Sequence, residues 1–297
     1  MTSMTETRTH TRSTAGSGGV TFVGVLRSEW IKLWSLMSTR ILLLLTLVAV
    51  IGIGGLAVLI RYSYLQERIR RAADQGQTMT PDMLEKTFPP GSGFDLYNLP
   101  NAGLQIGILV LGSLAVLFIS SEYATGMIRS TMNAVPRRTP AFVAKAILLA
   151  VVSYIITTVA AFATFLIAMP VFRGMGFDLD WSTDGVLYSV FTGGLYVAGV
   201  ALIGLSLGTL LRNSAGGITV LVGLFFVLSI AANFMTLIPG DFWKYVPQYL
   251  PSEAGGRFLS IGHTDAVIDP WQGGLIFLGY VLLFLVPAMI ALKKRDV

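Results

Sequence analysis

The chain has 297 residues, of which 54% are hydrophobic and 12% are charged, and its mean hydropathy is +0.70. A soluble domain carries about 25% charged residues, so this composition excludes a large soluble core and predicts a polytopic membrane protein. The net charge of +5 follows from an excess of Lys and Arg in some of the loops, so we expect no nucleic-acid partner. The chain has no cysteine, which excludes disulfides and thiolate metal sites.

The first forty residues predict two segments. Residues 1–19 are mostly Thr, Ser, Gly and Arg, a composition that cannot bury enough apolar surface to fold, and we expect a disordered tail. Residues 20–40 should form a helix whose apolar residues gather on an arc of about 120° of the helical wheel. These residues are Phe22, Val23, Leu26, Trp30, Leu33, Trp34 and Met37. Two Trp residues with flanking cations favour an amphipathic helix in the lipid headgroup region, and a cytoplasmic extension of the first span is the alternative.

Six stretches contain no Lys, Arg, Asp or Glu, and each is long enough to cross a hydrocarbon core of about 30 Å as a helix. They are residues 41–60, 102–121, 146–172, 185–211, 213–240 and 270–292. Backbone groups in lipid must be satisfied within the segment, so residues 41–297 are predicted to form an all-α domain of six transmembrane helices. No ionisable group is expected at membrane depth, which argues against a proton relay or an ion pathway. Any transport would then draw its energy from elsewhere.

The distribution of basic residues among the loops predicts the orientation. Thirteen Lys and Arg residues fall on the side that holds both termini, against eight on the other side. By the positive-inside rule, the chain should lie in the cytoplasmic (cell) membrane with both termini in the cytoplasm. The external loop 61–101 should begin with a helical continuation of the first span over residues 62–74. In the last external loop, residues 242–249 are a candidate for a short re-entrant or surface helix.

Two pairs of glycines have the spacing that lets helices approach closely. They are Gly103 with Gly107, and Gly204 with Gly208. Such pairs also arise by chance in a chain with 32 glycines, so each pair is either a packing face or an accident of composition.

Sequence motifs for catalysis are absent. The sequence has no G-x-x-x-x-G-K-[ST] motif and no Gly-Lys dipeptide, so it lacks a phosphate-binding loop. His10 and His263 are predicted on opposite sides of the membrane and cannot share a metal ion. We therefore predict that the chain is not an enzyme, has no catalytic residue and holds no metal or cofactor of its own.

The first cytoplasmic loop, residues 120–145, is the most informative polar segment. From Glu122 to Asn133 it can form a short helix that continues from the second span and exposes Met127, Ile128 and Met132. An exposed apolar patch of this kind needs something to cover it. The alternative is an ordinary positively charged loop whose apolar residues touch lipid.

At this loop the chain resembles a known family. Glu122-x-x-x-Gly126-Met127-Ile128-Arg129-x-Thr131, followed by Pro136-Arg137-Arg138, is similar to the signature of the permease subunits of type-2 ABC transporters, the exporter class. Three further segments resemble that family in the same order. Residues 27–33 are similar to its N-terminal elbow helix, 210–216 to its second cytoplasmic turn and 250–255 to its last external loop. The resemblance covers most of residues 20–297.

The resemblance implies a function and partners. Permeases of this family pair as homodimers or heterodimers and dock on two copies of a separate ATPase subunit, which binds ATP and Mg²⁺. The chain would then be the transmembrane subunit of a transporter that exports or flips a small-molecule or lipid-like substrate. The family's coupling helix maps onto Glu122, Tyr123, Gly126, Met127, Ile128 and Arg129.

Three polar residues at membrane depth are candidates for the substrate path, which the resemblance places at the interface between two permeases. They are Gln105, Asn233 and Thr236, and interhelical hydrogen bonding is the alternative role for them. Two other functions remain open, a secondary transporter and a non-transporting membrane sensor or scaffold that binds a cytoplasmic partner.

Overall fold

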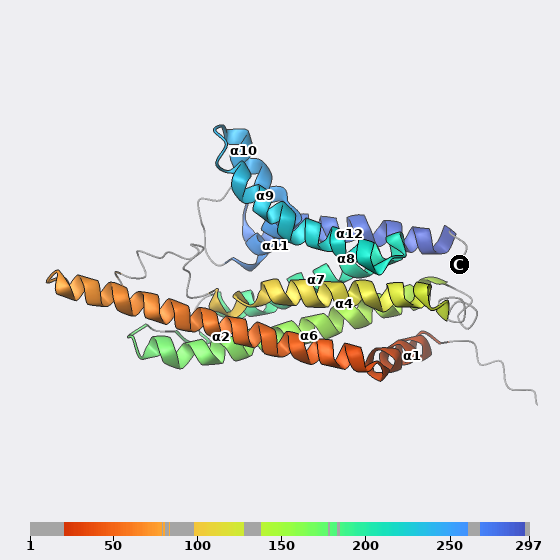
Figure 1. The fold of residues 1–297 in the computed structure, drawn as a ribbon, viewed down its shortest axis with the longest axis horizontal. Helices are drawn as coiled ribbons and strands as arrows, with labels where there is room; N and C mark the ends of the chain where they lie inside the picture. The colour runs from red at the N-terminus through yellow and green to blue at the C-terminus, as the bar shows by residue number, and fades with distance from the viewer. Residues whose placement is uncertain are drawn as a thin grey trace, which may run out of the picture.

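The computed structural model describes residues 21–78, 80, 83, 98–127, 138–177, 179–182, 185–260 and 268–294. Throughout these ranges the chain forms helices joined by turns (Figure 1), which confirms the all-α prediction. The predicted disordered tail, residues 1–19, lies outside the described residues. Ile128 and Arg129 of the predicted coupling helix also lie outside them.

Six helices are long and apolar enough to cross a membrane, judged by length and composition. In chain order the spans are α2 (Met37–Asp74), α4 (Leu104–Ala124), α6 (Arg138–Arg173), α7 (Val186–Leu211), a composite fifth span and α12 (Pro270–Lys294). The fifth span consists of α8 (Ser214–Val222), the π-helical turn η2 (Gly223–Val227) and α9 (Leu228–Met235). The predicted six-span, multi-pass membrane architecture is therefore confirmed.

The remaining elements are shorter than these spans. They are α1 (Phe22–Ser35), η1 (Leu99–Asn101), α10 (Asp241–Tyr245), η3 (Val246–Tyr249) and α11 (Pro251–Leu259). The extended residue Leu36 separates α1 from α2, so residues 20–40 are not a simple continuation of the first span. The placement of α1 in the lipid headgroup region stays a prediction.

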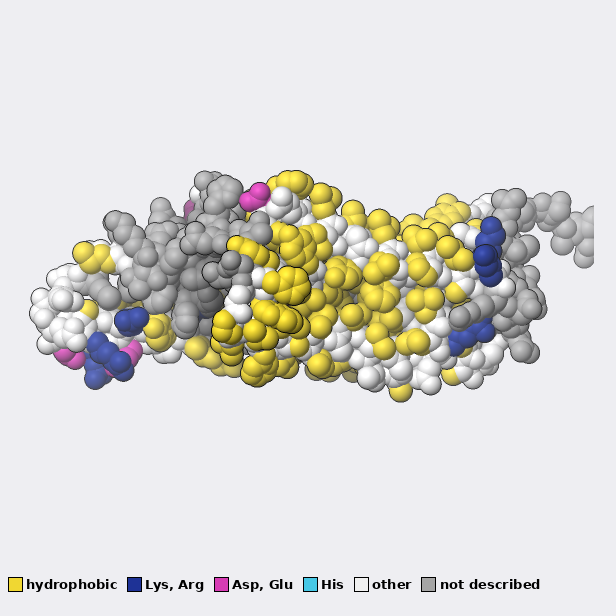
Figure 2. All heavy atoms as spheres, turned by 90° about the horizontal axis from the view of Figure 1, so that it is seen from above, with side chains coloured by type: hydrophobic (Ala, Val, Ile, Leu, Met, Phe, Trp, Pro, Cys, Tyr) yellow, Lys and Arg dark blue, Asp and Glu magenta, His cyan; other side chains and the backbone are white. Residues whose placement is uncertain are grey.

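The spans run along the long axis of the molecule, and α1 lies at the same end as the C-terminus of α12 (Figure 1). The end of the bundle that holds α1 is called the α1 end below, and the other end of the long axis is called the opposite end. Apolar side chains cover the middle of the face shown in Figure 2, and Lys and Arg side chains lie toward both of its ends. An apolar belt between two charged ends is the pattern expected of a bundle that crosses a membrane.

The orientation can be tested directly because the chain has no native cysteine. A single cysteine in place of the exposed residue Gln77, at the opposite end, should react in intact cells with a thiol reagent that does not cross membranes. A single cysteine in place of the exposed residue Thr139, at the start of α6, should react only after the cells are permeabilised. Labelling of Thr139 but not of Gln77 in intact cells would reverse the predicted orientation.

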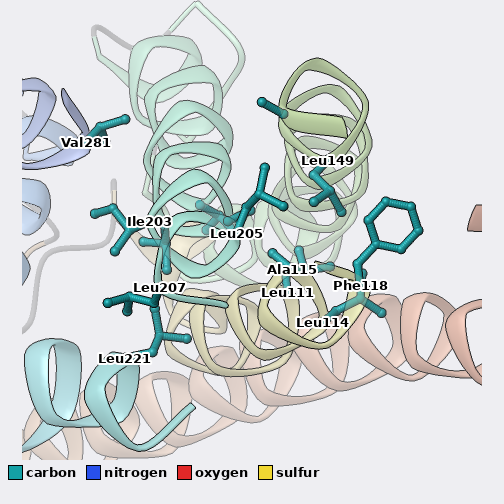
Figure 3. Packing of buried hydrophobic residues seen from close by; sticks show 14 of the residues in the cluster. Leu111, Leu114, Ala115, Phe118, Leu149, Ile203, Leu205, Leu207, Leu221 and Val281 are labelled. Atoms are coloured by element: carbon teal, nitrogen blue, oxygen red, sulfur yellow. The ribbon is translucent and has the colours of Figure 1, made fainter. Parts of the chain in front are cut away.

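Helix α7 lies at the centre of the bundle and packs against α4, α6, α11 and α12. In its most apolar stretch 78% of the residues are buried, whereas in the most apolar stretch of the fifth span 17% of the residues are buried. Figure 3 shows Leu205 of α7 facing Leu111 and Ala115 of α4 and Leu149 of α6. The fourth span is therefore the core of the fold, and the fifth and sixth spans leave most of their surface to lipid or to a partner.

Two glycines of α7 bring that helix against α4. A Cβ atom at Gly204 would overlap the backbone oxygen of Gly112, and one at Gly208 would lie 2.8 Å from the backbone oxygen of Val116. The predicted packing face at Gly204 and Gly208 is therefore confirmed. Gly103 likewise abuts the backbone of Val50 in α2.

Substituting Gly204 with Ala should therefore destabilise the bundle. The new methyl group meets backbone, which cannot rotate away, and overpacking of this kind costs about 1–3 kcal/mol. Gly279→Ala in α12 is the matched control, because nothing lies within 4 Å of a Cβ atom at that position. Thermal unfolding of the purified variants measures the difference, and equal melting temperatures would show that the α4–α7 contact is not tight in solution.

Helices α2 and α6 extend together toward the opposite end. The predicted helical continuation over residues 62–74 is confirmed, because α2 runs to Asp74. A second apolar cluster lies where α2, α6 and the turn after α6 meet. In it Trp181 stacks on Phe162 with ring centroids 4.3 Å apart, and Leu65 of α2 is buried.

Candidate functional site

Four charged side chains meet at the α1 end of the bundle. Glu29 and Lys32 come from α1, Glu122 from the last turn of α4 and Lys145 from the beginning of α6. Glu29 and Lys145 are each 1% exposed and Glu122 is 3% exposed. Because Lys and Glu are almost never fully buried unless they are paired, we call these four residues the ion-pair cluster and treat it as the candidate site.

The two lysines each bind both carboxylates. Lys145 Nζ donates to Glu122 Oε1 at 2.6 Å and also to Glu29 Oε2. Lys32 Nζ donates to Glu29 Oε1 at 2.9 Å and to Glu122 Oε1 at 3.2 Å. The Lys145 ammonium also lies 4.7 Å from the ring centroid of Phe118. Two acids and two bases give the cluster no formal net charge, and it links three helices that are far apart in the sequence.

The local sequence explains how the cluster is assembled. Glu29 lies four residues after Val25 and four before Leu33, so all three share one helical face, and all three are buried. Val25 packs on Ala141 and Ala144 of α6. These small residues let α1 come close enough for Glu29 to reach Lys145. A charged residue inside an apolar i, i+4, i+8 stripe is the sequence signal that could have revealed this contact.

Lys32 is the more exposed of the two lysines, and its ionisation is coupled to the cluster. Partial burial lowers the pKa of Lys32, but the hydrogen bonds and negative charges of Glu29 and Glu122 outweigh it, so the pKa is raised above 10.5. A raised folded-state pKa contributes stability that is fully present below the unfolded value and is lost as pH rises through the folded value. Lys32 therefore remains protonated throughout the physiological range, and its contribution to holding α1 is lost only above pH 10.5.

The structure separates the predicted coupling residues into two groups. Glu122 is buried within its own chain, and Tyr123 is half-buried, with the guanidinium of Arg212 lying 5.1 Å from its ring centroid. Gly126 and Met127 are exposed. A helix that is continuous from Glu122 was predicted, and this is wrong, because α4 ends at Ala124. Gly126 has a φ of +71°, the left-handed conformation that commonly ends a helix at glycine.

The contact between Tyr123 and Arg212 was not predicted from the sequence. Arg212 lies in the turn between α7 and α8 and has a φ of 52°. Its guanidinium covers the Tyr123 ring, so the second predicted cytoplasmic turn lies beside the first. The ion-pair cluster and this pair together join residues from α1, α4, α6 and the α7–α8 turn into one unit.

The three candidate path residues come from two different spans. Gln105 is exposed in the first turn of α4, whereas Asn233 is exposed on α9 and Thr236 is exposed at the C-cap of that helix. Asn233 donates to the Ser229 carbonyl at 2.9 Å, and Thr236 donates to the Asn233 carbonyl at 2.7 Å. In the described part of the chain these two side chains bond within their own helix, and their place on a substrate path stays a prediction.

One acidic side chain lies nearer to the spans than the sequence predicts. Glu253 was assigned to an external loop, but α11 carries it back among the spans, where it accepts a hydrogen bond from Ser229 of α9 at 3.1 Å. Ser229 lies six residues before the end of α9, which corresponds to about 9 Å along a helix. The candidate segment 242–249 lies within α10 and η3, and α11 follows it in the chain.

The fold and the site define the class of protein as a multi-pass helical membrane protein with a buried ion-pair cluster at one end of the bundle. Compared with known proteins, the chain matches no family model and no curated protein. Its function is therefore argued from the fold, the candidate site and the sequence motifs.

Proposed function

We propose that this chain is the transmembrane permease subunit of an ATP-driven ABC transporter in the cytoplasmic membrane. Two copies of a separate ATPase bind ATP and Mg²⁺, and a second permease, identical or homologous, completes the membrane domain. The complex exports or flips a small-molecule or lipid-like substrate. The ion-pair cluster is the observation that carries the proposal, because it fixes α1 to the ends of two spans beside the segment that resembles a coupling helix.

The physical argument concerns force transmission. A membrane subunit without a phosphate-binding loop has to receive its energy through contact with another protein. That contact must be attached rigidly to the spans, or movement of the partner would be lost in a flexible loop. Buried ion pairs contribute little net stability but are very sensitive to the loss of one partner. In this proposal the cluster holds α1, α4 and α6 in one geometry.

The proposal gives the predicted coupling residues different roles. Gly126 and Met127 are exposed and, with Ile128 and Arg129, contact the ATPase directly. Glu122 is a positioning residue, since its carboxylate is bound by Lys32 and Lys145 of the same chain. Tyr123 is a second positioning residue, through its contact with Arg212.

The test is to purify the tagged chain from its native membranes in a mild detergent and to measure ATP hydrolysis and subunit composition. We expect an ABC ATPase to copurify and to hydrolyse ATP, and we expect no hydrolysis once that subunit has been removed. Sustained hydrolysis by a preparation free of any other subunit would contradict the proposal. So would the recovery of an intact chain with no ATPase under conditions that preserve membrane complexes.

Glu253 favours a second function, a secondary transporter, because an acidic group within the membrane can take part in ion or proton coupling. Purified chain reconstituted into liposomes separates the two possibilities. Uptake or efflux driven by an imposed ion gradient, with no ATPase and no ATP present, would support the secondary transporter. Transport that requires both an ATPase and ATP would support the permease.

A further inference from the structure

Helix α11 re-enters the bundle from the opposite end. The hydroxyl of Tyr280 donates to the Tyr249 carbonyl, just before α11, at 3.1 Å. Tyr280 lies ten residues into α12, or about 15 Å along a helix. The hydroxyl of Tyr188, near the start of α7, donates to the Phe258 carbonyl at the end of α11 at 3.1 Å. Tyr249 therefore lies inside the bundle, and α11 runs from there back toward the opposite end.

The position of α11 is fixed by close packing. A Cβ atom at Gly255 would overlap the ring of Tyr196 in α7, and one at Gly273 of α12 would lie 2.7 Å from the Ala254 carbonyl oxygen. Pro251, Ser252 and the two small residues Ala254 and Gly255 are buried. Glu253, between them, is directed away from this packed face toward α9, where Ser229 binds it.

Glu253 is half-buried, and its carboxylate has one described partner. Its described hydrogen bond comes from a neutral hydroxyl. Within the described ranges no ion pair joins it to a Lys, Arg or His side chain. An acid at membrane depth is costly and is normally paired or functional. The group therefore favours a cation as its missing partner.

A polar stripe on α9 leads away from Glu253. Ser229, Asn233 and Thr236 are spaced i, i+4 and i+7, so they share one face of the helix, and Asn233 and Thr236 are exposed. The π-helical turn η2 directly precedes α9, and such turns are frequent at functional sites. Figure 1 shows α9 and α10 directed away from the long axis of the bundle.

A further oxygen acceptor lies next to Glu253 in the chain. Ser252 is 8% exposed, and within the described residues its hydroxyl Oγ is buried with no hydrogen-bond partner. Ser252 belongs to the packed face of α11, so among the described residues the Glu253 carboxylate is contacted by the Ser229 hydroxyl. Calcium takes six to eight oxygen ligands, which is more than this set offers, whereas an ammonium group donates only three hydrogen bonds.

We propose that Glu253, with Ser229 and the α9 stripe, binds the protonated amine of a cationic ligand in the half of the membrane nearest the opposite end. That the ligand is the transported substrate rests on the proposed function, whereas the binding site itself does not. The carboxylate neutralises the ammonium, and Ser229 orients the carboxylate. Asn233 and Thr236 provide polar contacts between this point and the end of the span.

The test uses the purified full-length chain in lipid nanodiscs, without an ATPase, and measures binding of 2-phenylethylamine by equilibrium dialysis against empty nanodiscs. The neutral analogue 2-phenylethanol has similar size and controls for partition into lipid. We expect saturable binding of the amine but not of the alcohol. Glu253→Gln should weaken amine binding about tenfold or more, because it removes the negative charge and replaces a charge-assisted hydrogen bond to the ammonium with one to a neutral amide oxygen. Glu67→Gln, at an exposed carboxylate of α2, should leave amine binding unchanged.

Ser229→Ala provides a second test that keeps the carboxylate, and we expect it to weaken amine binding less than Glu253→Gln does. It also tests the site if Glu253→Gln is not recovered as folded protein. Absence of saturable amine binding by the native chain, or equal binding by the native chain and both variants, would overturn the site. Saturable Ca²⁺ binding that depends on Glu253 would overturn the choice of ligand. No ATPase takes part, so these results are independent of the test of the proposed function.

Discussion

Replacing Lys145 with Met is expected to destabilise the folded chain by about 3–5 kcal/mol, since it leaves two buried carboxylates without their shared partner. Lys145 is 1% exposed and binds both Glu29 and Glu122. Lys32 would remain, but its side chain is 28% exposed, and one ammonium cannot neutralise two acids. We expect a lower melting temperature of the purified protein and a loss of folded protein from membranes.

Two further variants separate loss of the ion pairs from a general effect of the substitution. Arg71→Met removes the ion pair with Glu67, whose side chains are 71% and 45% exposed, and it should cost about 1 kcal/mol or less. Adding Glu29→Gln and Glu122→Gln to Lys145→Met removes the orphaned charges and should recover part of the lost stability. If Lys145→Met is as mild as Arg71→Met, the cluster is not buried in solution as described.

The six spans were predictable because their signal is local and redundant. Each span needs only length and apolarity, and a helix is the structure that satisfies its own backbone in lipid. The division of the N-terminal segment was partly predictable. Trp30 and Trp34 on the predicted apolar arc are 45% and 38% exposed, whereas Glu29, outside it, is buried. A helical wheel finds apolar faces and cannot identify a charged residue that packs against another helix.

The contacts that define the candidate sites were not predictable because they join distant residues. Glu29 and Lys145 are 116 positions apart, and each alone resembles an ordinary charge at the edge of a membrane span. Glu253 was misplaced for a related reason. Its helix, α11, has nine residues, too few to register as a span, and its small residues and single acid are typical of a loop. Only packing against Tyr196 and α12 shows that it returns into the bundle.

The second large effect concerns the exposed part of the predicted coupling helix. Met127 is 47% exposed just after the helix-ending Gly126, and Ile128 follows it outside the described residues. If this segment inserts into a cleft on the ATPase, replacing Met127 and Ile128 together with Asp places unpaired charge in that contact. The cost of about 3–5 kcal/mol corresponds to a loss of affinity of about two to three and a half orders of magnitude, at about 1.4 kcal/mol for each tenfold change.

The ion-pair cluster is untouched by this change, so the variant should reach the membrane in normal amounts and keep its native melting temperature. We expect the ATPase to be lost from the purified complex, and transport with it. Gln75 and Gln77 are both exposed at the opposite end, and replacing them with Asp should change neither. The two variants distinguish docking from stability. Lys145→Met should lower both the melting temperature and the amount of ATPase that copurifies, whereas the change at Met127 and Ile128 should remove the ATPase without lowering the melting temperature. A Met127 and Ile128 variant that still retains its ATPase and transports normally would show that the segment is a solvated connection, and the assignment of the coupling helix would then be wrong.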